Sequence, residues 1–406
     1  MARLPFPLQV VLVAGCAFGI MWFSTPSPHA EYDYTRRVAV WLLDGSTGTG
    51  VQPPPWLNEM VPHDGRYFSV FPLGSVLSAM PLAIPTRNHD NFWFGVPEQK
   101  ATQFLLLRGF LSLIAAGIAA FAYALAGRHG LPAWKKILFA FTPLFATCLW
   151  PNLSYGGAWQ MALGFAVLGT LGAIYFSTGT PRPFLAGAFF ALGFGNRTEI
   201  LLTAPILYFL LLGQRPPDWL RRIVLFSIVP FLLGVATLAY NAARFGTPFD
   251  FGYARIPGVL EEPWYRDGIF ALSAIPRNAY AMLIEPWRQL PEFPWLVPTG
   301  WGGSLFLYSP FLLLVLFRIR RGNPTMRVAC WTAVAMLTFL LWIHGNPGGW
   351  QVSYRYASVL FPWLLVLLLE GEPRKKIGWA PALIAVSIAI NGFANWIFCH
   401  TPYMRP

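Results

Sequence analysis

The sequence predicts an all-α integral membrane protein with about eleven transmembrane helices, within a range of 10 to 13. Of the 406 residues, 55% are hydrophobic and 11% are charged, whereas soluble proteins carry roughly 25% charged residues. The apolar residues form long unbroken runs, unlike the alternating pattern of membrane β-barrel strands. The basic residues behind the net charge of +12 sit in short clusters between these runs, which argues against a nucleic-acid partner.

The apolar runs predict one transmembrane domain over residues 1–397, followed by a short outer tail over 398–406. Two long polar connections, 26–102 and 242–301, are the predicted outer loops. The predicted spans are 7–25, 103–126, 137–151, 158–176, 184–195, 199–213, 223–241, 302–317, 328–344, 353–369 and 377–397.

A further apolar stretch over 68–85 decides the orientation of every later span. Because Pro72, Gly74 and Pro81 interrupt it, we expect it to lie along the membrane interface. With the N-terminus in the cytoplasm, 15 of the 29 Lys and Arg residues then fall in short inner segments, where such residues are retained. The outer side then holds 14 of the 17 acidic residues, which predicts a working surface there. The alternative is that the outer loops merely cap the bundle.

Two carboxylates, Glu31 and Asp33, follow the first span directly. In an extended segment both point to one face, whereas in a helix they diverge by about 200°. Asp33 is the first candidate for a general base that removes a proton from an acceptor hydroxyl. The alternative is that Asp33 caps an amphipathic helix predicted over 34–43 and pairs with Arg36 or Arg37.

His63, Asp64 and Arg66 lie within four residues of the first outer loop. These side chains are candidates to position a substrate at the rim of a cavity. The alternative is an ordinary turn with Asp64-Gly65 at its tip, since Asp-Gly is a frequent turn sequence. No His or Cys spacing typical of a structural zinc site occurs in the chain.

Arg197 follows an apolar run of only 12 residues, 184–195. A helix of that length covers about 18 Å, well short of the roughly 30 Å hydrocarbon core. The short span suggests a cavity below the membrane surface, in which the forked donors of Arg197 would bind a phosphate. Arg197 and Glu199 are therefore candidate substrate-binding residues. The alternative is that they simply pair with each other.

Arg355 lies just inside the apolar run 353–369, between Tyr354 and Tyr356. Tyrosine is enriched where membrane and water meet, so this segment belongs near the outer interface. Tyr354 and Arg355 are candidates to bind a lipid phosphate. The alternative is that they anchor the span at the interface.

Several short motifs follow one another along residues 5–370. They are Glu31-Tyr32-Asp33; Asp64-Gly65-Arg66-Tyr67 with Phe71-Pro72-Leu73-Gly74; Tyr240-Asn241 with Arg244-Phe245-Gly246-Thr247-Pro248; Leu307-Tyr308-Ser309-Pro310; and Gly348-Gly349-Trp350 with Tyr354-Arg355-Tyr356. In this order they resemble the GT-C class of multi-spanning glycosyltransferases, in the branch of the protein O-mannosyltransferases and the lipid A aminoarabinose transferase. That class is known for an acidic pair in the first outer loop, which Glu31-Tyr32-Asp33 fits. The chain departs from it where Phe71-Pro72 replaces the usual Pro-Pro.

The resemblance implies an inverting transferase in a bacterial inner membrane, with its active site on the periplasmic face. The donor would be a polyprenyl-phosphate-linked sugar, and the acceptor a hydroxyl of a lipid, glycan or protein. Arg197 and Arg355 would neutralise the leaving phosphate, and Asp33 would deprotonate the acceptor. The resemblance favours metal-independent transfer without a cofactor and leaves Mg²⁺ or Mn²⁺ dependence open.

Two other functions fit the composition. A lipid or sugar transporter or flippase would carry ionisable groups near the middle of the membrane and two related halves, and the sequence shows neither clearly. A non-catalytic membrane subunit on the same scaffold is the second alternative.

Overall fold

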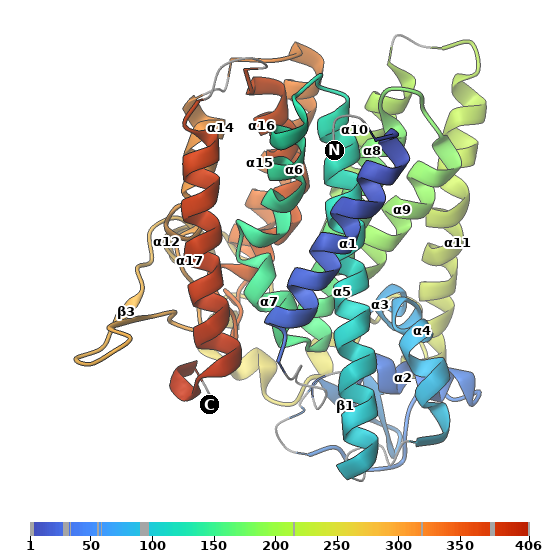
Figure 1. Cartoon of the computed structure of the whole chain (residues 1–406). Coiled ribbons are helices and arrows are strands. Elements are labelled where there is room, and N and C mark those ends of the chain that lie inside the picture. Colours follow the sequence, from blue (N-terminus) through green and yellow to red (C-terminus); the bar gives the residue numbers. More distant parts are fainter. Residues whose placement is uncertain are drawn as a thin grey trace.

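The computed structural model places most of the chain in helices that run along a common direction (Figure 1). It describes residues 4–26, 32, 34–54, 57, 59–89, 97–213, 216–317, 320–373 and 378–404. Apart from two short hairpins, the regular structure of this part of the chain is helical. The prediction of an all-α membrane protein is therefore confirmed at this coarse level.

Within the described ranges, six helices are long and apolar enough to cross a membrane. They are α1 (Phe6–Ser24), α5 (Pro97–Gly127), α8 (Ala158–Ser177), α11 (Trp219–Phe245), α15 (Pro324–Ile343) and α17 (Ala380–His400). A seventh candidate is the pair α6 (Ala133–Phe145) and α7 (Leu149–Tyr155), which is bent by 55°.

The other predicted spans are shorter or interrupted helices. They are α9 (Pro183–Asn196); η3 (Thr198–Thr203) with α10 (Ala204–Leu212); α13 (Leu305–Tyr308), η8 (Pro310–Leu312) and α14 (Leu313–Phe317); and η9 (Arg355–Leu360) with α16 (Phe361–Gly371). Proline explains some of the breaks, since Pro310 and Pro362 each start a new helical segment. The count of eleven crossings stays a prediction.

The first long connection folds into small elements at one end of the bundle (Figure 1). These are α2 (Tyr34–Leu43), β1 (Met60–His63), β2 (Arg66–Ser69), α3 (Leu73–Ser78), α4 (Met80–Ala83) and η2 (Ile84–His89). Helix α2 covers the residues predicted to form an amphipathic helix. The stretch 68–85 holds two short helices that meet at Ala79 and contains no long one.

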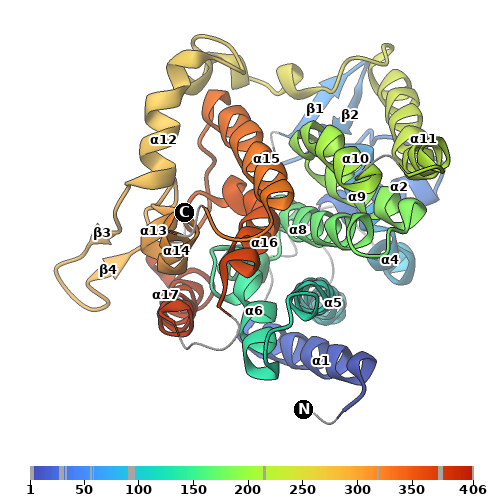
Figure 2. The same cartoon turned by 90° about the horizontal axis from the view of Figure 1, so that it is seen from above.

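The second long connection lies at the same end as the first and links α11 to α13 (Figure 1). Its elements are η4 (Tyr253–Arg255), η5 (Val259–Glu261), η6 (Pro263–Tyr265), η7 (Leu272–Ala274), α12 (Ile275–Leu283), β3 (Arg288–Gln289) and β4 (Leu296–Val297). The chain closes with η10 (Pro402–Met404) at this end, opposite the start of α1. Viewed along the bundle, α11 and α15 stand on different sides of α8 (Figure 2).

Buried amide side chains hold the interrupted segments in place. Asn152 of α7 donates to the carbonyl of Val352 at 2.8 Å and accepts from its N–H at 3.1 Å. Asn391 of α17 donates to the carbonyl of Tyr308 at 2.7 Å, where α13 ends. Backbone that leaves a helix in an apolar setting needs such partners, because an unpaired buried N–H or C=O is costly.

Glycines let neighbouring helices approach closely. A Cβ atom added to Gly187 of α9 would lie 1.9 Å from the carbonyl oxygen of Phe226 in α11. A Cβ atom on Gly169 of α8 would lie 2.4 Å from the backbone N of Gly193 in α9. Because both obstacles are backbone atoms, the α8–α9–α11 layer requires glycine at these positions.

We expect Gly187→Ala to destabilise the protein by about 1–3 kcal/mol, because the added methyl group must push α9 away from α11. The measurement is the thermal unfolding midpoint of the detergent-solubilised protein. Gly19→Ala is the matched control, since a Cβ atom there has no heavy atom within 4 Å. Equal midpoints for the two variants would contradict the close contact.

Candidate functional site

A cavity of about 1480 Å³ opens at the end of the bundle that carries the long connections. Its walls come from the first connection, from α8, α9, η3, α11 and α15, from the segment 247–270 and from η9. Its volume exceeds the range of about 300–1,000 Å³ typical of small-molecule pockets. A ligand larger than a simple metabolite fits there.

Arg355 is a charged group in this wall that forms no ion pair among the described residues. It stands at the start of η9 and is 6% exposed. Its Nε has no hydrogen-bond partner, and within the described ranges no carboxylate lies at ion-pair distance from it. Its guanidinium lies 5.3 Å from the ring centre of Tyr356. Its charge interacts with that of Glu59, but the two form no ion pair within the described ranges, so a bound anion would stabilise this buried cation.

Arg197 lies in the same cavity but is already neutralised. It follows α9 directly, and its Nε and Nη2 both lie 2.7 Å from Oε1 of Glu199. Its guanidinium also covers the ring of Tyr356 at 4.7 Å. Arg197, Glu199 and Arg355 therefore all line one cavity, which is necessary if they bind the same substrate. It also forms the Arg197–Glu199 pair that was the alternative interpretation.

Tyr354 is fully buried, and its hydroxyl donates to the carbonyl of Leu341 at 3.0 Å. The cavity is lined instead by the next tyrosine, Tyr356. Tyr354 therefore fastens the start of η9 to the end of α15, which helps to hold Arg355 in place.

The candidate residues His63, Asp64 and Arg66 form the tip of the β1–β2 hairpin and do not line the cavity. Asp64 and Gly65 make its turn with positive φ angles of 46° and 74°. Arg66 donates to Ser46 Oγ and to the Gly48 carbonyl, both at 2.7 Å. The three residues thus form a hairpin turn, which is what the alternative interpretation predicts.

Glu31 and Asp33 lie outside the described residues. Tyr32 and Tyr34, their described neighbours in sequence, both line the cavity. The aromatic ring of Tyr32 stacks on that of Tyr155 at 5.9 Å. The general-base role of Asp33 stays a prediction.

The sequence interpretation assigns no role to Arg244 or Glu59, which both line the cavity. Arg244 was noted only within a motif, and Glu59 was not noted at all. Arg244 ends α11 and donates to Asn241 Oδ1 at 2.6 Å and to the Ser69 carbonyl. Glu59 accepts a hydrogen bond from Trp159 Nε1 at 3.1 Å. No local pattern marks Glu59, because its partner lies 100 residues away.

An ion pair within the segment 247–270 positions Arg255, which in turn hydrogen-bonds to the β1–β2 hairpin. Arg255 donates from Nε to Asp250 at 2.6 Å and from Nη1 to His63 Nδ1 at 3.1 Å. Burial alone would raise the pKa of Asp250, but hydrogen bonds from Arg255 and Gly252 and the nearby arginine charges outweigh it and lower the pKa. Asp250 is therefore a weaker base than an ordinary carboxylate.

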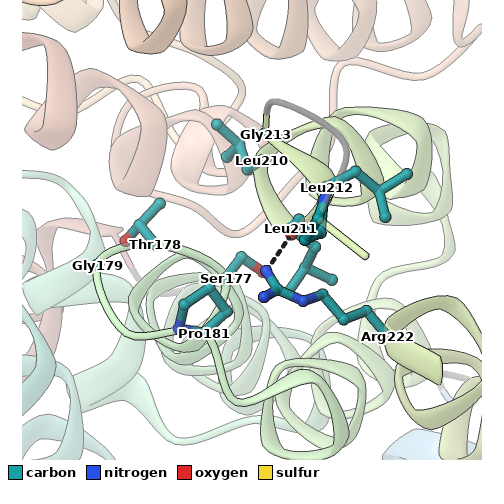
Figure 3. Close-up of a pocket in the computed structure, with 10 residues that line it drawn as sticks. Ser177, Thr178, Gly179, Pro181, Leu210, Leu211, Leu212, Gly213 and Arg222 are labelled. Carbon is teal, nitrogen blue, oxygen red and sulfur yellow. Dashed lines mark hydrogen bonds between the residues drawn. The ribbon is translucent and has the colours of Figure 1, made fainter. Parts of the chain in front are cut away.

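A smaller pocket of about 350 Å³ lies at the opposite end of the bundle, between the ends of α8 and α10 and the start of α11 (Figure 3). Its arginine, Arg222, donates to the Leu211 carbonyl at 3.0 Å and to Asp218 at 2.9 Å. Arg222 is thus paired with Asp218 and hydrogen-bonded to the backbone. Unlike Arg355 in the larger cavity, it already has an ion-pair partner.

The fold and the cavity define a helical membrane protein with a large cavity that is lined by both acidic and basic side chains. Among the residues that the structure describes, no group of three His, Cys, Asp or Glu side chains is placed to hold a metal ion. No family model, no curated protein and no solved structure matches the chain.

We expect the anchoring of segment 247–270 to weaken in acid. Because the pKa of Asp250 is lowered in the folded protein, its stabilising effect is present above the unfolded pKa of about 3.9. It is lost as the pH falls through the lower, folded value. Hydrogen exchange of residues 250–256, corrected for intrinsic rates, should rise below about pH 4.

Asp250→Asn is the control for this titration, because it should give fast exchange at every pH. Equal protection of wild-type residues 250–256 at pH 6 and pH 3 would contradict the ion-pair anchor.

Proposed function

We propose that this protein is a membrane glycosyltransferase. It moves a sugar from a polyprenyl-phosphate-linked donor to a hydroxyl of a lipid, glycan or protein acceptor on the non-cytoplasmic side. The observation that carries the proposal is Arg355, a buried guanidinium in a large cavity with no carboxylate partner among the described residues. A phosphate is the anion that best matches the forked donors of arginine.

The cavity also offers an apolar wall for the lipid part of the donor. Phe194 of α9, Leu238 of α11 and Leu340 of α15 line it, and α11 and α15 are both candidate spans. Lipid-facing helices therefore border the space beside Arg355. A polyprenyl chain can lie along these helices while its phosphate reaches the guanidinium.

The charge distribution supports the side on which transfer takes place. The cavity acids Glu59, Asp250 and Glu262 belong to the long connections at one end of the bundle. Arg128, Arg182 and Arg222 lie in or beside the short connections at the other end (Figure 1). By the positive-inside rule the basic end faces the cytoplasm, and the cavity faces away from it.

The chemistry needs a neutralised leaving group and an activated acceptor. The acceptor oxygen forms a bond to the anomeric carbon, and the bond from that carbon to the phosphate oxygen breaks. The electron pair of the broken bond stays on the phosphate, where the positive charge of Arg355 stabilises it. Asp33 is the base predicted from the sequence. No step of this mechanism uses a metal ion.

We expect Arg355→Ala to weaken binding of polyprenyl phosphate at least about tenfold, because truncating one partner of a buried charge pair is costly. Binding of the uncharged polyprenol should not change. Arg355→Lys should bind with intermediate affinity, since lysine keeps the charge but loses the fork. The measurement is native mass spectrometry of the purified protein titrated with each lipid.

Arg66→Ala is the matched control, because Arg66 is held by the hairpin outside the cavity. Equal affinity of wild type and Arg355→Ala for polyprenyl phosphate would refute the donor site. Binding and transbilayer movement of the lipid without any sugar transfer would favour the transporter or flippase alternative.

A further inference from the structure

Glu59 is a carboxylate fixed at the cavity wall. Its backbone carbonyl accepts from the N–H of Val70 at 3.1 Å, which extends the β1–β2 hairpin by one hydrogen bond. Its side chain accepts from Trp159 Nε1 at 3.1 Å. The Trp159 ring packs on Phe71 with centroids 4.2 Å apart. Glu59 is thus held from the hairpin on one side and from α8 on the other, and both Glu59 and Trp159 line the cavity.

The groups that surround Glu59 come from three other elements. Arg355 belongs to η9, Glu262 to the segment 247–270, and Tyr34 to α2. Burial raises the pKa of Glu59, the charge of Glu262 adds to this, and hydrogen bonds and the charge of Arg355 only partly oppose it. Within the described ranges no hydrogen bond joins Glu59 to Arg355, although their charges interact. Both groups line the same cavity, so a ligand bound there can lie next to both.

The other described acids of the cavity are less suited to accept a proton. Glu199 is held by two nitrogen atoms of Arg197. Asp250 is held by Arg255, and its pKa is lowered. Glu262 lines the same cavity and burial raises its pKa as well, but no side-chain hydrogen bond orients it within the described part of the chain.

We propose that Glu59 is the general base of the reaction and that the acceptor hydroxyl binds between its carboxylate and Arg355. This inference rests on the proposed function and assigns the role of base to Glu59 in place of Asp33. The acceptor O–H bond breaks and its proton goes to the carboxylate of Glu59. The acceptor oxygen bonds to the anomeric carbon as the phosphate leaves with the electron pair towards Arg355. A carboxylate whose pKa is raised towards the working pH is an efficient base for this transfer.

The test measures donor binding and sugar transfer separately in the full-length protein. Glu59→Gln should bind polyprenyl phosphate within about twofold of wild type and should lower kcat/KM for transfer by about 10²–10⁴-fold. Glu292→Gln is the matched control and should keep most of the activity, because Glu292 is exposed and lies outside the cavity. Glu59→Asp should keep part of it, with the acidic limb of the pH–rate profile displaced. Asp33→Asn, measured in parallel, compares the two candidate bases.

A second readout separates a base from a merely structural residue. The defect of Glu59→Gln should shrink when the acceptor hydroxyl is made more acidic, because such an acceptor needs less help to lose its proton. A structural defect would be the same for every acceptor. An unchanged unfolding midpoint would show that Glu59→Gln is folded.

The outcomes distinguish the two proposals. If wild type transfers sugar and Glu59→Gln retains transfer within about threefold, Glu59 is not the base but the proposed function stands. The same holds if the defect is equal for all acceptors or accompanies a loss of donor binding. If wild type binds the donor and transfers no sugar, the proposed function fails and the role of Glu59 fails with it.

Discussion

The cavity depends on one buried amide, Asn152, which satisfies both polar groups of the Val352 backbone. The chain is not α-helical there, so its N–H and C=O need partners from another element. The same pair of hydrogen bonds places η9, three residues further on, against the cavity. The position of Arg355 is therefore a consequence of backbone hydrogen bonding, supported by the bond of Tyr354 to Leu341.

The three arginines of the cavity differ in what satisfies them. Glu199 neutralises Arg197, and Asn241 and the Ser69 carbonyl occupy Arg244. Arg355 forms no ion pair or hydrogen bond with another described residue, and its guanidinium lies beside the ring of Tyr356. Since burying an unpaired charge costs more than burying a pair, the chain keeps one arginine in a state that a bound anion stabilises. This contrast is the basis for proposing Arg355 as the arginine that binds the donor phosphate.

The cavity carboxylates show the same division. Asp250 and Glu199 are paired with arginines, whereas Glu59 has a neutral indole donor and a buried setting. Arginine neighbours favour the charged form of a carboxylate, and burial disfavours it. Side chains with the same functional group therefore differ in basicity within one cavity. Their chemistry follows from their neighbours and not from residue type.

The sequence by itself determined the membrane class, the helix over 34–43 and the breaks in the apolar runs beside Arg197 and Arg355. Hydrophobicity and helix breaks are local properties, so residue order is enough to predict them. Only the tertiary structure decided that Glu59 accepts a hydrogen bond from Trp159 and that His63 accepts one from Arg255. It also decided that Arg355 forms no ion pair with a described acid. The hydrogen-bonded partners are 100 and 192 residues apart. Packing of distant segments sets such contacts, and no periodicity in the chain encodes them.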